Sequence, residues 1–119
     1  MAQSGKQQSI TIYHNPKCAT SQHVLAIIEE SGSKPKVVEY LKAGWTKPQL
    51  KALFAAAGLT PRQAMRKKAA EDLGVSEKAT AAQILDAMVE HPVLVERPFV
   101  ESAKGARLCR PKEKVRELL

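Results

Sequence analysis

A strand–helix–strand pattern in the first forty residues constrains the fold more than any other feature. Residues 9–13 (SITIY) are rich in β-branched side chains, and residues 37–40 (VVEY) form a second β-like run. Between them, from about Ala19, the apolar residues Val24, Ile27 and Ile28 recur at helical spacing. Two strands joined by one helix over such a short stretch form, by default, a parallel right-handed βαβ unit.

The middle of the chain carries three helix-start signals. A threonine followed three residues later by glutamine, the spacing of a capping box, occurs at Thr46, Thr60 and Thr80. We expect helices to begin there and to end near residues 58, 68 and 91, with one further turn at 71–74. The apolar face of the third helix is expected to contain Ile84, Leu85, Met88 and Val89.

The last third returns to strands. Residues 98–100 and 107–109 are expected to pair across a turn at 103–106, and Pro111 to begin a final helix. The order βαβ, helical insert, ββα predicts an α/β fold with a mixed sheet flanked by helices. We expect one domain over residues 10–119, preceded by a disordered leader at 1–9 that lacks the apolar region of a signal peptide.

Composition narrows the functional classes. The 119 residues carry a net charge of +7 but only 4% aromatic residues, and the longest basic stretch is Arg66-Lys67-Lys68, so nucleic-acid binding is not expected. No apolar run approaches the ~18 residues of a membrane span. Two cysteines without a secretory signal favour the reducing cytoplasm.

Cys18 stands where the first strand meets the first helix, the place where helix N–H groups converge on an anion. An ordinary thiol is only ~3% ionised at pH 7, and lowering its pKa by about two units requires about 2.7 kcal/mol. The terminus of a helix stabilises a nearby negative charge such as a thiolate by ~0.3–1 kcal/mol, and by about 2 kcal/mol at most. A cation or several hydrogen bonds must therefore contribute, from His14 or from an arginine that folds onto the loop.

Spacing excludes several chemistries. Cys18 begins a C-x-x-S sequence, so no second thiol is placed to resolve a disulfide locally. A phosphatase loop of the C-x5-R kind needs arginine where Val24 stands, and no zinc-ligand spacing occurs. Cys109 ends a predicted strand and is expected to be a packed small hydrophobe.

Four segments together resemble the glutaredoxin-coupled arsenate reductase family of the arsenate reductase/Spx superfamily. They are ITIYHNPKCATS from Ile10, AMRK from Ala64, HPVLVERP from His91 and GARLCRP from Gly105. The resemblance implies a thioredoxin-like fold with a helical insert, and it implies that Cys18 is the nucleophile.

The resemblance also implies roles for other side chains. Three arginines match those that bind the oxyanion and lower the thiol pKa, namely Arg66, Arg97 and Arg110. His14 matches a histidine that influences the thiolate, and Asn15 and Ser21 match residues of the anion-binding loop. Pro98 matches the cis-proline region of thioredoxin-like folds.

The implied activity is reduction of arsenate to arsenite through the Cys18 thiolate, with glutathione as co-substrate, glutaredoxin as partner and no bound cofactor. Two alternatives stay open at this point. One is a thiol-redox enzyme of the same fold with another substrate, such as a glutathionylated protein. The other is a non-catalytic Spx-like adaptor that binds RNA polymerase, although redox-sensing adaptors of that type carry C-x-x-C.

Overall fold

A computed structural model of the chain describes residues 9–119, so the predicted leader lies outside the described residues except for Ser9. The chain divides into two compact units. The first joins the N-terminal segment up to Glu39 to Arg97–Leu119, and the second is Tyr40–Glu96, which corresponds to the expected helical insert. Within the described part, no helix has both the length and the apolar character needed to span a membrane.

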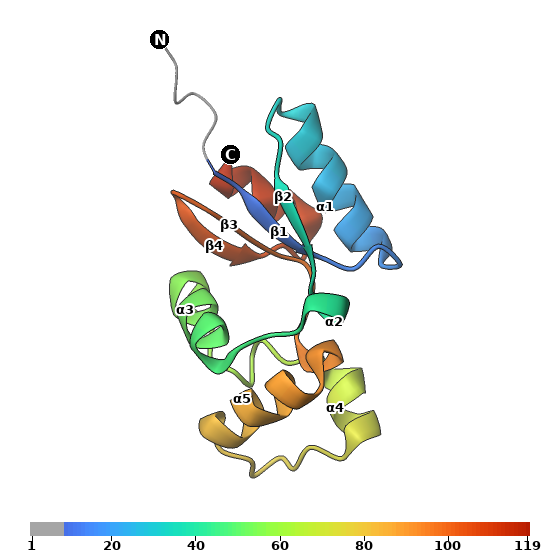
Figure 1. Cartoon of the computed structure of the whole chain (residues 1–119), viewed down its shortest axis with the longest axis vertical. Coiled ribbons are helices and arrows are strands. Elements are labelled where there is room, and N and C mark those ends of the chain that lie inside the picture. Colours follow the sequence, from blue (N-terminus) through green and yellow to red (C-terminus); the bar gives the residue numbers. More distant parts are fainter. Residues whose placement is uncertain (1–8) are drawn as a thin grey trace. The chain divides into compact units, whose positions relative to one another are not determined.

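The first unit is built on a four-stranded mixed sheet (Figure 1). Its strands are β1 (Thr11–His14), β2 (Lys36–Glu39), β3 (Phe99–Ser102) and β4 (Gly105–Leu108), in the order β2-β1-β3-β4. Strand β1 runs parallel to β2 and antiparallel to β3, and β3 and β4 form an antiparallel hairpin. The predicted mixed sheet and its order along the chain are confirmed.

Two helices complete this unit: α1 (Ala19–Glu30) and the 3-10 helix η2 (Lys112–Leu118). They contact each other and the sheet, α1 through β1 and η2 through β3 and β4. Ile12 pairs with Val37 on one side and with Val100 on the other, so these three residues share a face. The buried core of the unit contains Ile10, Ile12, Val24, Ile27, Ile28, Val100, Cys109, Val115 and Leu118.

The second unit is helical. Its elements are α2 (Tyr40–Ala43), α3 (Lys47–Ala57), α4 (Lys67–Leu73), α5 (Ala81–Glu90) and the 3-10 helix η1 (Pro92–Leu94). The capping boxes predicted at Thr46 and Thr80 are both formed, with each hydroxyl accepting from the backbone N–H of a glutamine three residues on. Helices α3 and α5 contact each other, and η1 contacts α2, α4 and α5. The residues buried here include Leu50, Leu53, Phe54, Ile84, Leu85, Met88 and Leu94.

The helix predicted from Thr60 to about residue 68 is wrong. Thr60 and Gln63 do form both capping-box hydrogen bonds, but residues 61–64 make only a turn, and α4 begins at Lys67. The chain leaves the helical path because Met65 pairs with Val95 in an antiparallel bridge. The N–H of Arg66 then donates to the carbonyl of Leu94, so non-local pairing overrides the local start signal.

Three smaller expectations also need correction. Tyr40, predicted to end the second strand, is the first residue of α2, where its ring lies 5.6 Å from that of Trp45. Val89, predicted on the apolar face of α5, is 39% exposed. The final helix begins after Pro111 as expected, but its hydrogen bonds are of the tighter 3-10 kind.

The capping box of α5 gives a direct test of this local analysis. Thr80→Ala removes the hydroxyl that satisfies the N–H of Gln83, so the free energy of unfolding should fall by about 1 kcal/mol in urea titrations. Thr80→Ser keeps the hydroxyl and should lose much less. Equal losses in the two variants would show that the cap does not stabilise the helix.

Candidate active site

Cys18 is the N-cap residue of α1, at the end of the short loop that follows β1. Its N–H donates to the carbonyl of Asn15 at 3.0 Å, and its own carbonyl accepts from the N–H of Gln22 at 3.0 Å. The side chain of Asn15 accepts from the N–H of Lys17 at 3.0 Å, which closes a tight turn just before the cysteine. The thiol therefore stands at the first turn of α1, as the sequence predicts.

Ser21 ties the two ends of this loop together. Its side chain is 0% exposed, and its hydroxyl accepts from the N–H of Asn15 at 3.1 Å. The same hydroxyl lies 2.6 Å from Nδ1 of His14, the last residue of β1. The three predicted loop residues, His14, Asn15 and Ser21, are thus brought together beside the cysteine.

His14 does not supply the missing positive charge. Burial lowers the pKa of this histidine below its ordinary value, and the charge of Glu39 opposes that effect only in part. The ring is therefore neutral at pH 7, which suits Nδ1 as the acceptor of the Ser21 hydroxyl proton. The sequence leaves two sources of positive charge near Cys18 open, His14 or an arginine, and His14 is not the source.

The pKa of the Cys18 thiol is lowered by its surroundings. Partial burial acts to raise it, but the N–H of Ser21, the charge of Arg97, the N–H of Thr20 and a hydrogen bond from the Arg97 side chain together outweigh burial. Arg97 is thus the cation beside the sulfur. The sequence predicts that the helix terminus alone cannot lower this pKa enough. Arg97 supplies the cation, and the N–H groups of Ser21 and Thr20 supply the hydrogen bonds.

The hairpin register explains why Arg97 and Arg110 lie close together. Phe99 pairs with Leu108, and the N–H of Cys109 donates to the carbonyl of Pro98 at 2.9 Å, so pairing continues past both strand ends. One residue further, Nη1 of Arg110 donates to the carbonyl of Arg97 at 3.1 Å. Both arginines precede a cis-proline, and the Arg97-Pro98 isomer is the one that the resemblance implies.

Arg66 belongs to the other compact unit. It is the half-buried N-cap residue of α4, and its N–H donates to the carbonyl of Leu94 at 2.7 Å. Its part in an oxyanion site stays a prediction from the family resemblance.

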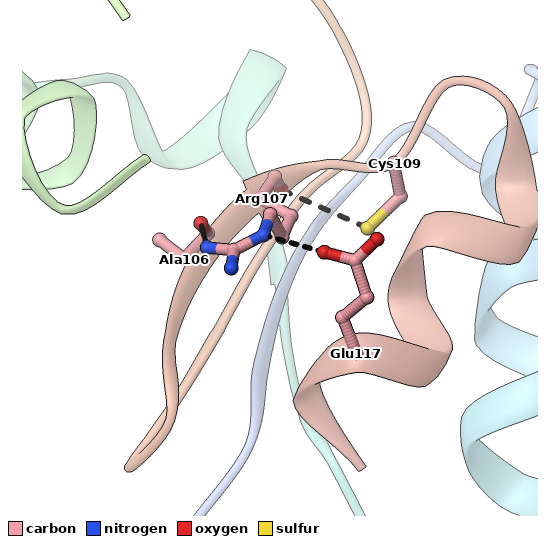
Figure 2. Close-up of polar contacts among 4 residues, drawn as sticks. All are labelled: Ala106, Arg107, Cys109 and Glu117. Atoms are coloured by element: carbon pink, nitrogen blue, oxygen red, sulfur yellow. Dashed lines mark hydrogen bonds and ion pairs between the residues drawn. The ribbon is translucent and has the colours of Figure 1, made fainter. Parts of the chain in front are cut away.

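Cys109 is the packed small side chain that the sequence predicts. It is 0% exposed, and its sulfur lies 3.7 Å from the carbonyl of Arg107, whose side chain pairs with Glu117 of η2 (Figure 2). Burial, reinforced by the charge of Glu117, raises the pKa of this thiol to about 12. Ionised Cys109 is therefore negligible at pH 7.

Two contributors to the site were not identified from the sequence. The N–H of Thr20 faces the sulfur, and the side chain of Gln22 donates to the carbonyl of Pro16 at 2.5 Å, which ties α1 to the turn before Cys18. A backbone N–H has no residue-specific signal in a sequence. Among residues 9–119, no cluster of three or more histidine, cysteine or carboxylate side chains is arranged to hold a metal ion.

Comparison with known proteins agrees with this geometry. The sequence matches the ArsC family over residues 13–118. The chain belongs to the ArsC family. It is 59% identical to the arsenate reductase ArsI1 of Synechocystis sp. over 116 residues, which cover 95% of this chain and 81% of that protein. It is 43% identical to an arsenate reductase of Escherichia coli K12, with coverage of 93% and 81%.

Solved structures of the family share the whole fold. The arsenate reductase from Vibrio cholerae superposes with a TM-score of 0.90 and 38% identity, covering 96% of this chain and 100% of that one. A further structure described as an arsenate reductase, from Yersinia pestis, gives a TM-score of 0.88 at 39% identity. The family and the thioredoxin-like α/β fold inferred from the sequence are confirmed.

The charge of Arg97 can be tested through the reactivity of Cys18. Because a neighbouring cation favours the thiolate, Arg97→Gln should raise the pKa of Cys18 and slow its alkylation by iodoacetamide several-fold at pH 7. The measurement is the alkylation rate against pH, with the modified site identified by mass spectrometry. Arg107→Gln, in the same hairpin but paired with Glu117, should leave the profile unchanged. An unchanged profile for Arg97→Gln would contradict this account of the thiolate.

Proposed function

We propose that this chain reduces arsenate to arsenite, with Cys18 as the nucleophile. The observation that carries the proposal is the Cys18 thiol at the first turn of α1. Two helix N–H groups and Arg97 lower the pKa of this thiol and so favour the thiolate. A thiolate beside a guanidinium can both attract a tetrahedral oxyanion and attack it. The arsenate reductases among the relatives, similar over nearly the whole chain, support arsenate as the substrate.

The first chemical step forms a bond between sulfur and arsenic. The Cys18 thiolate attacks arsenate, one arsenate oxygen takes up protons and leaves as water, and a Cys18–arsenic(V) adduct remains. Arg97 and Arg110, placed together by the hairpin, hold the anion. The family resemblance implies Arg66 as the third ligand. Neutral His14, with Asn15 and Ser21, keeps the loop in the shape that presents the sulfur.

The second step is the reduction. The thiolate of glutathione attacks the Cys18 sulfur, the sulfur–arsenic bond breaks, and its electron pair stays on arsenic, which leaves as arsenite. A mixed disulfide between Cys18 and glutathione remains. A glutaredoxin thiolate then attacks the glutathione sulfur and releases the Cys18 thiolate. An external thiol is needed because the C-x-x-S sequence supplies no local resolving cysteine, and a reducing compartment such as the cytoplasm keeps Cys18 free.

The two cysteines provide the central test. Cys18→Ser should reduce glutathione- and glutaredoxin-dependent arsenate turnover to background, because a serine hydroxyl is not ionised at pH 7. Cys109→Ser should keep most of the activity, since Cys109 is buried and protonated. Turnover is followed through the coupled oxidation of glutathione.

Other outcomes of the same experiment separate the alternatives. Equal loss in both variants would make the assignment wrong. Wild-type protein that reduces a glutathionylated protein but not arsenate would favour a thiol-redox enzyme with another substrate. Capture of RNA polymerase together with no thiol turnover would favour an Spx-like adaptor.

Arg66 needs a test of its own. Arg66→Gln removes a charged donor from the anion, so the KM for arsenate should rise about tenfold or more, in line with a charge-assisted hydrogen bond. The neighbouring exposed cation offers a matched control, and Lys67→Gln should change the KM little. The same small change of KM in both variants would show that Arg66 does not bind arsenate.

A further inference from the structure

A hollow opens directly beside the Cys18 loop, within the first unit. It measures about 230 Å³ and is lined by Thr20, His23, Arg110, Pro111, Lys112 and Glu113. Thr20, whose N–H faces the Cys18 sulfur, is one of the lining residues, so the hollow lies next to the loop that carries the thiol. Its two walls come from the first turns of α1 and from the start of η2, two helices that contact each other.

The lining is more basic than acidic. Arg110 and Lys112 bring two permanent cations and Glu113 one carboxylate, and His23 adds an exposed ring. Arg110 uses one N–H group on the carbonyl of Arg97, and a guanidinium has five. Lys112 lies 3.2 Å from Glu113, with both side chains about half exposed, so this pair is weak and can exchange partners.

We propose that this hollow binds a carboxylate arm of glutathione while its thiol attacks Cys18. The inference rests on the proposed glutathione-dependent reaction. The hollow is smaller than the ~300–1,000 Å³ of sites that enclose a whole ligand, so it takes one arm and leaves the rest of the tripeptide over the sulfur. The γ-glutamyl arm of glutathione carries one carboxylate and one ammonium group, which matches the cation of Lys112 and the carboxylate of Glu113.

The reaction step itself fixes where the tripeptide must lie. The attacking thiolate must approach the Cys18 sulfur from outside the protein, because no second cysteine is near it in the chain. A carboxylate held at Lys112 restrains the co-substrate next to that sulfur and raises its local concentration. Arg110 also belongs to the proposed oxyanion site, so Lys112 is the residue through which the hollow can be tested separately.

The test uses a disulfide in place of arsenate. Wild-type protein is converted to a thiopyridyl mixed disulfide at Cys18, and release of thiopyridone is followed with glutathione and with uncharged β-mercaptoethanol. In each case the incoming thiolate forms a disulfide with Cys18 and the thiopyridone leaves with the electron pair of the broken bond. Lys112→Glu should slow the reaction with glutathione about three- to tenfold, as expected for charge reversal at an exposed site, and change that with β-mercaptoethanol much less.

Controls separate a binding site from a general charge effect. Lys34→Glu makes the same charge change in the loop beyond the other end of α1 and should leave the rates with both thiols unchanged. His23→Glu, on the opposite wall of the hollow, should repeat the effect of Lys112→Glu. Equal slowing with both thiols, or equal effects of Lys34→Glu and Lys112→Glu on glutathione, would overturn the proposal. A wild-type protein that does not turn over arsenate would instead contradict the proposed function, because this assay contains no arsenate.

Discussion

The buried hydroxyl of Ser21 holds the loop before α1 in the shape that presents Cys18. It accepts the N–H of Asn15 at one end of the loop and meets Nδ1 of His14 at the end of β1. Leaving such buried groups without partners costs about 1–3 kcal/mol each, so the loop has little freedom to adopt another shape. The N–H of the same serine faces the sulfur. One residue therefore both closes the loop and stabilises the thiolate.

The two thiols of the first unit show that surroundings, and not residue type, decide which cysteine favours the thiolate. Burial acts on both in the same direction, toward the neutral form. At Cys18 two helix N–H groups and Arg97 overcome it, whereas Cys109 is fully enclosed beside the carboxylate of Glu117 (Figure 2). With a pKa of about 12, Cys109 is a small apolar side chain in practice.

Local signals in the sequence were enough where the structure is local. The caps at Thr46 and Thr80 are where the sequence predicts them, whereas the hairpin turn is shorter than the predicted 103–106, because Gly105 and Ala106 already pair in β4. Thr60 carries the same signal and makes the same hydrogen bonds, yet no α-helix follows, because residues 64–66 pair with 94–96. A local sequence pattern carries no information about a pairing partner thirty residues away. The helix expected after Thr60 could therefore not be recognised as wrong from the sequence.

The site divides in the same way. Cys18 was identified from its position between strand and helix, but the neutral state of His14 depends on burial, which the sequence does not show. Arg97 was identified only through the family resemblance, and the sheet gives the physical reason for its position. Strand β3 runs antiparallel to β1 and begins beside Tyr13, so Arg97, two residues earlier, lies next to the loop.

The hairpin then fixes the second arginine. Because pairing continues from Phe99 and Leu108 to Pro98 and Cys109, Arg110 comes opposite Arg97. A slip of one residue in either strand would turn one set of side chains to the other face of the sheet. The register that buries Val100 and Cys109 in the core therefore also places both cations at the end of the sheet where β1 delivers Cys18.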